Sequence, residues 1–284
     1  MSIRHRSRAR SDAPVARFVL PVSNVAVALR QPTGAEDILL AEHRIEDPAL
    51  ALALAERLGH ADPAVDWAEL PVTDIDTLIA RLRQAVIGNR VIAEINCNTA
   101  SCGQRVDLSF GIDAWLAHHR PRSGRSRRRD WWTERADDDA PGWYILHNNA
   151  GGDADAVRFR LPTLADQIAI DGLPDAVAAL AVRCIRPANS PGQTRLRVEA
   201  AMAMLSPPLA GPLQGRCPHC AAPIAARFEA RLYCLQEMRD RARFVYDDID
   251  ALAERYHWSE RAILTLPYAR RITYVERARQ ARSG

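Results

Sequence analysis

Hydrophobic residues recur along the chain with two periods, which divide it into helical and extended segments. Apolar positions three and four residues apart predict helices near 47–58, 73–88, 163–171, 173–184 and 194–205. Alternating apolar and polar positions predict strands at 90–97, 104–110, 142–148 and 156–162. Helices mixed with short strands indicate an α+β fold that is mainly helical.

The longest helical pattern runs from Glu229 to about His257. Its apolar residues are spaced alternately three and four apart, the pattern that buries one narrow stripe against another helix. The stripe can dock on another protein or on the chain's own helices at 73–88 and 194–205, and the pattern favours neither. The candidate partner-binding residues on it are Leu235, Met238, Val245, Ile249, Leu252 and Tyr256. A last basic helix follows, so 229–284 are predicted to form a C-terminal helical region.

Two segments lack either period. Residues 1–14 are rich in Arg and Ser and are predicted to be a disordered basic arm. Residues 120–141 combine Arg, Ser, Gly and Asp and are predicted to be a mobile Arg-rich loop within an α+β body at 15–228. In that loop, Trp131 and Trp132 are candidate anchors for a protein partner.

Composition narrows the class of protein. The chain has 284 residues, 48% of them hydrophobic, and a net charge of +3, which is typical of a globular protein and gives no general preference for nucleic acid. No apolar stretch reaches the roughly 18 residues of a membrane span. The apolar segment near the N-terminus is interrupted by Pro21, Ser23 and Asn24 and resembles a strand more than a secretory signal. We therefore expect a cytoplasmic protein whose six cysteines are thiols or metal ligands.

Four of the cysteines form two close pairs. Cys217 and Cys220 make a C-x2-C knuckle, and Cys97 and Cys102 make a C-x4-C pair. When Cys102 is aligned with Cys220, the residues that follow also match at a constant offset of 118: Val106 with Ile224, Leu108 with Ala226, Phe110 with Phe228 and Trp115 with Tyr233. The chain is thus predicted to carry one unit twice, at about 90–118 and 213–235. In each copy a cysteine pair and a tight turn precede a strand and a helix.

Two such knuckles at hairpin tips can face each other and supply four sulfurs, as in a zinc ribbon split between distant segments. We predict a structural Zn2+ site at Cys97, Cys102, Cys217 and Cys220, with iron as the less common occupant. The alternative is that these are ordinary reduced cysteines in a buried environment. For Cys184 and Cys234, which lie on apolar helical faces, core filling is the prediction.

Motifs of common enzymes are absent from the sequence: it has no G-x-S-x-G, no P-loop, no G-x-G-x-x-G and no H-E-x-x-H. The prediction is therefore a protein without catalytic activity or a small-molecule substrate. The Arg-rich stretches at 4–10 and 120–129 leave a zinc-ribbon nucleic-acid-binding protein as the alternative function, although nucleic acid is the less favoured partner.

Three stretches resemble a known family. They are "LPVTDIDTLIARLRQAVIGNRVIAEINC", "VRFRLPTLADQIA", and the C-terminal part from "CPHC" to "YHWSERAILTLPYARRITYVE". The family is described as T4-type baseplate (hub assembly) protein and is found with contractile phage tails and phage-like injection systems. The resemblance spans roughly 35–282, with the W-S-E-x-x-I-L-x-L-P stretch as its most telling part.

The resemblance implies a structural or assembly role in a baseplate, with hub, spike or tube components as partners. By the same resemblance, the family's cysteine pairs fall on Cys97, Cys102, Cys217 and Cys220. The chain departs from the family pattern in its C-x4-C first pair and in its Arg-rich insertion at 120–141.

Overall fold

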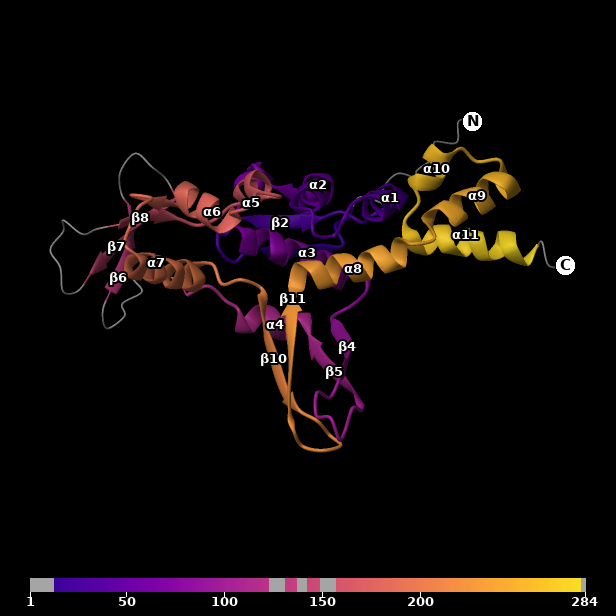
Figure 1. The fold of residues 1–284 in the computed structure, drawn as a ribbon. Coiled ribbons are helices and arrows are strands. Elements are labelled where there is room, and N and C mark those ends of the chain that lie inside the picture. The colour runs from indigo at the N-terminus through magenta and orange to yellow at the C-terminus, as the bar shows by residue number, and fades with distance from the viewer. Residues whose placement is uncertain (1–12, 123–130, 137–141, 149–156, 282–284) are drawn as a thin grey trace.

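The computed structural model describes residues 13–122, 131–136, 142–148 and 157–281. The protein is elongated: a helical centre lies between a sheet-containing lobe and a C-terminal helical unit, and two β-hairpins project from the centre as a stalk (Figure 1). The predicted basic arm lies almost wholly outside the described residues. Within those ranges, no helix is both long and apolar enough to cross a membrane.

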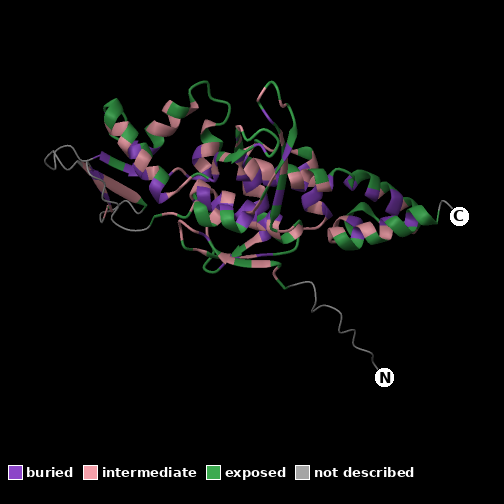
Figure 2. Cartoon of the chain, turned by 90° about the horizontal axis from the view of Figure 1, so that it is seen from below, coloured by how far each residue is buried: buried purple, intermediate pink, exposed green. Residues whose placement is uncertain are grey.

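The centre is built around one amphipathic helix, α3 (Val72–Val86). Its Ile75, Leu78, Ile79 and Leu82 are almost completely buried, as expected for apolar residues three and four apart. Around it lie α1 (Gly34–Glu42), α2 (Pro48–Leu58), the short 3-10 helix η1 (Trp67–Glu69), and a three-stranded antiparallel sheet of β1 (Ala16–Val19), β2 (Ala26–Leu29) and β3 (Gly59–Ala61). The helices at 47–58 and 73–88 are confirmed to within two residues. Figure 2 shows that buried positions follow the inward sides of the helices.

Two hairpins form the stalk. The first is β4 (Arg90–Asn96) and β5 (Arg105–Gly111), followed by α4 (Ile112–His118). The second is β10 (Ala210–Arg216) and β11 (Pro223–Glu229), followed by α8 (Ala230–Ala242). β5 and β11 begin and end 118 residues apart, which is the offset of the predicted repeat. The two hairpins lie side by side in Figure 1.

The sheet-containing lobe corrects the prediction of a loop at 120–141. Trp131–Arg135 form a strand, β6, which pairs with β7 (Trp143–Asn148) in a four-stranded sheet completed by β8 (Val157–Arg160) and β9 (Ile185–Arg186). Residues 123–130 and 137–141 lie outside the described part of the chain. The helices of the lobe and its junction are α5 (Leu164–Ile170), α6 (Ala176–Cys184) and α7 (Gly192–Leu205). The fold is therefore α+β with several sheets rather than two hairpins alone.

The predicted continuous helix from 229 to 257 is wrong. It is two helices, α8 and α9 (Val245–Tyr256), separated at Arg243 and Phe244. The apolar spacing persists across the break because each helix has its own buried stripe. Leu235 and Met238 join the central core, whereas Leu252 packs in a separate cluster with α10 (Glu260–Leu264) and α11 (Tyr268–Gln280). The core therefore divides after α8 rather than at 229.

A buried ion-pair network joins the C-terminal unit to the centre. Arg271 of α11 is fully buried and contacts Asp37 of α1 at 2.5 Å and Asp248 of α9 at 3.1 Å. Beside it, the Gly34 N–H donates to the Leu266 carbonyl at 3.2 Å. A side chain on Gly34 would come within 2.9 Å of the Arg271 guanidinium, so the close approach requires glycine.

Candidate metal centre

Each hairpin tip folds its cysteine pair into a tight turn stabilised by main-chain hydrogen bonds. The Cys97 N–H donates to the Gln104 carbonyl at 2.9 Å, and the Cys217 N–H donates to the Ala222 carbonyl at 2.8 Å. The residues after the second cysteines, Gly103 and Ala221, both have left-handed backbones, with φ of 56° and 58°. Because Gln104 and Ala222, like Gly103 and Ala221, are 118 positions apart, the two turns are copies of one structure despite their different lengths.

The two tips bring four sulfurs together. The Sγ atoms of Cys97, Cys102, Cys217 and Cys220 all lie within 4.8 Å of one another. Across the hairpins, Cys97 and Cys220 are 3.7 Å apart, and Cys102 and Cys217 are 3.8 Å apart. A tetrahedral metal ion with metal–sulfur bonds of about 2.3 Å requires sulfurs about 3.8 Å apart. The residues present therefore fit a metal ion held by four cysteines, as the sequence predicted.

The cluster is partly shielded from solvent. Cys97 and Cys217 are buried, Cys102 is half-buried and Cys220 is exposed. Val106 and Ile224, which are equivalent in the two copies, pack beneath the sulfurs. A small apolar base of this kind limits the access of water to the ligands but is too small to hold two hairpins together alone.

The thiols of the cluster titrate differently. Hydrogen bonds from the main chain and hydroxyl of Thr99 lower the pKa of Cys97 to about 7. The Gln104 amide lowers the pKa of Cys102, but burial and the neighbouring sulfurs raise it to about 12. Four adjacent thiolates repel one another, so a bound cation is what allows all four sulfurs to lose their protons.

Four protein ligands close a tetrahedral site. With no position left for water or substrate, an ion held here joins parts of the chain rather than performing chemistry. The cysteines that it links across the hairpins are 115 and 123 residues apart in the sequence.

An aromatic cluster fixes the base of the stalk. The rings of Phe110 and Phe228 meet edge to face at 4.9 Å, and Trp115 and Tyr233 pack on Phe228 at 4.9 and 5.2 Å. These four residues are the two equivalent pairs found by the repeat alignment. Their contribution could have been anticipated from the alignment, although sequence reasoning assigned them no role.

Parts of the outer edges of the hairpins are covered. The Tyr233 hydroxyl donates to the Ile92 carbonyl at 2.9 Å, and Arg83 donates to the Arg90 carbonyl at 2.9 Å, so side chains occupy two of the outward acceptors of β4. Pro212 and Pro223 stand where the main chain of β10 and β11 points away from the partner strand. Proline has no N–H to offer there, which removes a donor from an open edge.

The other candidate residues lie inside the chain's own packing. Trp131 is a buried residue of strand β6, and Trp132 beside it stacks on His147 at 4.0 Å, so neither is on a mobile loop. Ile249 and Tyr256 are half-buried beside the C-terminal cluster. The remaining stripe residues, Leu235, Met238, Val245 and Leu252, are buried. These side chains pack within the monomer rather than forming one continuous partner-binding stripe, and α8 packs on α3 as the alternative interpretation required.

Cys184 and Cys234 are buried in helices away from the cluster, as predicted. Of the arginines behind the nucleic-acid alternative, at 4–10 and 120–129, Arg120 and Arg122 are described and the others lie outside the described residues.

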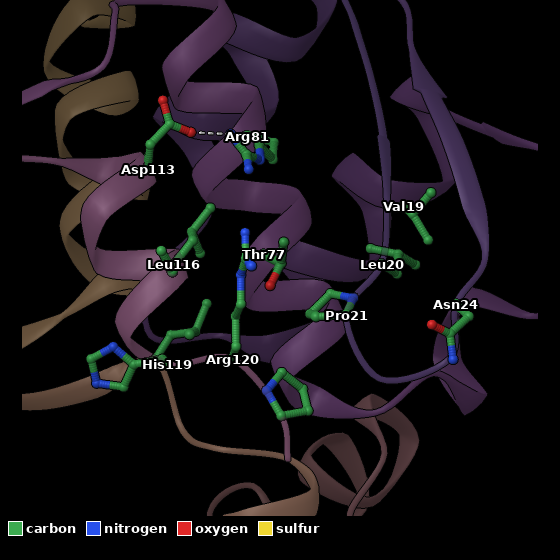
Figure 3. A pocket seen from close by; sticks show the side chains of 13 residues that line it. Val19, Leu20, Pro21, Asn24, Thr77, Arg81, Asp113, Leu116, His119 and Arg120 are labelled. Carbon is green, nitrogen blue, oxygen red and sulfur yellow. Dashed lines mark hydrogen bonds and ion pairs between the residues drawn. The ribbon is translucent and has the colours of Figure 1, made fainter. Parts of the chain in front are cut away.

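A pocket of about 530 Å3 lies between the β1–β2 turn, α3 and α4 (Figure 3). Arg81 and Asp113 pair at one wall at 2.5 Å, and Arg120 extends into the space beside Thr77. Gln84 contacts both members of this pair, accepting from Arg81 at 2.7 Å and donating to Asp113 at 2.9 Å.

Comparison of the chain with protein-family models, with curated proteins and with solved structures finds no match in any of the three.

Proposed function

We propose that the chain is a non-enzymatic structural or assembly component of the baseplate of a contractile phage tail or phage-like injection system. A structural Zn2+ at the stalk tip pins its two hairpins. The proposal assigns hub, spike or tube components as partners and places assembly in the cytoplasm. The observation that carries it is the closed four-sulfur cluster, because it joins remote segments and leaves no coordination position for a substrate.

Zinc is proposed over other metals because of the donor set. Four thiolates suit Zn2+ or iron and disfavour hard cations such as Mg2+ or Ca2+. The cross-hairpin distances of 3.7 and 3.8 Å match the tetrahedral geometry of structural zinc. Elemental analysis of the purified chain should return one zinc per molecule. Iron in its place would correct the metal, and a metal-free protein would contradict the clamp.

The segments that resemble the baseplate family have structural roles in this chain, which favours a scaffold. In the R-L-P-T segment, Arg160 pairs with Asp166 at 2.5 Å, and the Pro162 carbonyl accepts the Val72 N–H at 3.1 Å. These contacts attach β8 and α5 to the start of α3.

The W-S-E-x-x-I-L-x-L-P segment also organises helices. The Ser259 hydroxyl caps α10 by accepting the Ala262 N–H at 3.3 Å, and Ile263 is fully buried. Pro267 forms an isolated bridge with Thr33 at the joint to the centre. Residues of the segments that resemble the family therefore connect elements of the fold, as expected for a structural protein.

Co-expression with the sheath, tube, hub and spike proteins of a contractile tail tests the role. The tagged chain should co-purify with a hub, spike or tube component, and tails made without it should lack baseplates in electron micrographs. A monomer that binds no tail component, together with normal tails in its absence, would reject the proposal. Binding to single-stranded nucleic acid that weakens steeply as salt rises would favour the alternative function instead.

A matched pair of variants links the metal site to assembly. Cys217→Ser/Cys220→Ser removes two ligands and should abolish co-purification. Cys184→Ser is the control, because the Cys184 thiol is buried away from the cluster. The thiol lies 3.7 Å from an Asp166 oxygen, and a serine hydroxyl can make the same hydrogen bond. Equal loss in both variants would indicate general unfolding rather than loss of the clamp.

A further inference from the structure

Each hairpin contributes one accessible and one buried sulfur to the cluster. Cys220 is exposed and Cys102 is half-buried, whereas Cys217 and Cys97 are only 2% and 4% exposed. An oxidant arriving from solvent therefore reaches Cys220 and Cys102 first, and the buried sulfurs are available as resolving thiols.

Four sulfurs can pair in three ways, and the structure favours one of them. Joining Cys97 to Cys217 would leave two accessible sulfurs without a buried resolving partner. Of the other two pairings, the cross-hairpin one joins sulfurs that are already in contact: Cys220 stands 3.7 Å from Cys97, and Cys102 stands 3.8 Å from Cys217. These contacts share no residue, so both bonds can form in one molecule, and both cross between the hairpins.

We propose that the stalk tip is a redox latch, in which oxidation joins Cys220 to Cys97 and Cys102 to Cys217. Two disulfides then hold together the same hairpins that a metal ion holds under reducing conditions. The latch goes beyond the proposed function, because it concerns how the clamp persists when the metal is lost. The biological use of the latch rests on the proposed function, in which the particle is built inside a cell and acts outside it. The stalk then stays closed in both the reducing and the oxidising environment.

The chemistry balances with hydrogen peroxide as the oxidant. The Cys220 thiolate attacks one peroxide oxygen, the O–O bond breaks, and a sulfenic acid and hydroxide form. The Cys97 thiolate attacks the sulfenic sulfur, the S–O bond breaks, and the disulfide forms as a second hydroxide leaves. Each disulfide thus uses one peroxide, which accepts the two electrons that the sulfurs lose. Cys102 and Cys217 repeat the steps, and the four sulfurs no longer bind a metal as thiolates.

Peptide mapping of the full, metal-loaded chain tests the latch. After peroxide treatment, free thiols are blocked with a maleimide and the protein is digested with trypsin without reduction. Trypsin leaves Cys97 and Cys102 in peptide 91–105 and Cys217 and Cys220 in peptide 217–227. Cross-hairpin bonds join the two peptides into one species, whereas bonds within each hairpin leave them separate. We expect the joined species, with metal release measured in parallel by a colorimetric chelator.

Two double variants separate the remaining pairings. Cys102→Ser/Cys217→Ser leaves Cys97 with Cys220, and Cys102→Ser/Cys220→Ser leaves Cys97 with Cys217. We expect the first to cross-link at least about tenfold faster, because its accessible thiolate reacts readily with peroxide and its partner sulfur is in contact with it. Cys184 and Cys234 are internal controls in every sample. Burial raises the pKa of each to about 12, and both should react with maleimide only after denaturation.

Three results would overturn the latch. They are separate peptides each carrying an internal disulfide, sulfinic acids in place of disulfides, or equal cross-linking in the two double variants. If a variant does not fold, the unmodified chain decides the test. Whether its two tryptic peptides are joined or separate reports directly whether the disulfides cross between the hairpins.

Discussion

Asp74 and Asp76 lie two residues apart on α3 and illustrate how surroundings decide the effect of a buried charge. The Asp74 carboxylate accepts the N–H groups of Val22 and Ser23, both at 2.8 Å, and so fixes the turn after β1. The Oδ1 of Asp76 lacks a hydrogen-bond partner and stands 3.3 Å from Arg231. Burial raises the pKa of both carboxyls, that of Asp76 to about 6.

We expect Asp76→Asn to stabilise the protein at neutral pH. A carboxyl with a folded pKa of about 6 and a normal value of 3.8 binds its proton more tightly in the folded state. Its ionisation therefore opposes folding above pH 6, and the cost disappears as the pH falls towards 4. The upper limit of the gain is about 3 kcal/mol, since one pKa unit corresponds to about 1.4 kcal/mol. Urea unfolding at pH 7.5 and pH 4, compared between variant and parent, measures it.

Asp74→Asn is the control, and its expected sign is opposite. The two N–H groups bind different carboxylate oxygens, and an amide would replace one of those oxygens with an NH2 group that faces an N–H donor. A loss of about 1–3 kcal/mol is expected from the unsatisfied buried N–H. If both variants shifted stability in the same direction at pH 7.5, burial alone would explain the two sites and the role of the hydrogen bonds would be refuted.

At the scale of elements, the sequence predicts the duplicated hairpins best. The offset of 118 residues between the copies is carried by cysteines and alternating apolar residues, which are local signals that survive in a single sequence. The break between α8 and α9 could not be predicted, because Arg243 and Phe244 suit a helix and the apolar spacing continues through them. Strand β6 was missed because its five residues stand between charged runs that have no period. Its strand conformation comes from pairing with β7, a contact that local sequence does not encode.

Metal removal should loosen the stalk and leave the centre intact. A strong chelator removes the clamp, and the apolar base formed by Val106 and Ile224 is too small to replace it. We expect amide hydrogen exchange at the tips of β4, β5, β10 and β11 to rise at least about tenfold. Exchange in α2 and α3 should not change, because their core lies in the centre. A uniform rise across the chain would mean that the metal supports the whole fold, and no rise would mean that the hairpins pack without it.

On the scale of the whole molecule, the centre and the C-terminal unit have separate cores that are joined by polar contacts. The C-terminal cluster of Leu252, Ile263 and Val275 is distinct from the central core. Arg271 bridges the two through Asp37 and Asp248. Sequence reasoning missed this joint, because a buried arginine within a basic helix looks like any other surface charge in a single sequence.

Arg271→Met should weaken the joint strongly. It removes the guanidinium shared by two buried carboxylates, of which Asp248 keeps Arg279 at 3.9 Å, and breaking a buried pair typically costs about 3–5 kcal/mol. Arg270→Met, at the exposed neighbouring position of α11, should change the free energy of unfolding by less than about 0.5 kcal/mol. Thermal and urea unfolding of both variants measure the difference.

A triple variant, Asp37→Asn/Asp248→Asn/Arg271→Met, should recover much of the lost stability, because no unpaired charge remains buried. A triple variant as unstable as Arg271→Met alone would show that packing, rather than charge, holds the joint.

The prolines of the stalk and the Tyr233 hydroxyl that binds it affect how neighbouring molecules can associate. The open edge strands of a projecting hairpin can pair with the edge strands of another molecule, which leads to aggregation. Pro212 and Pro223 have no N–H to donate to an incoming strand, and the Ile92 carbonyl already accepts a hydrogen bond from Tyr233. Strand pairing between the stalks of neighbouring molecules is therefore disfavoured at these positions.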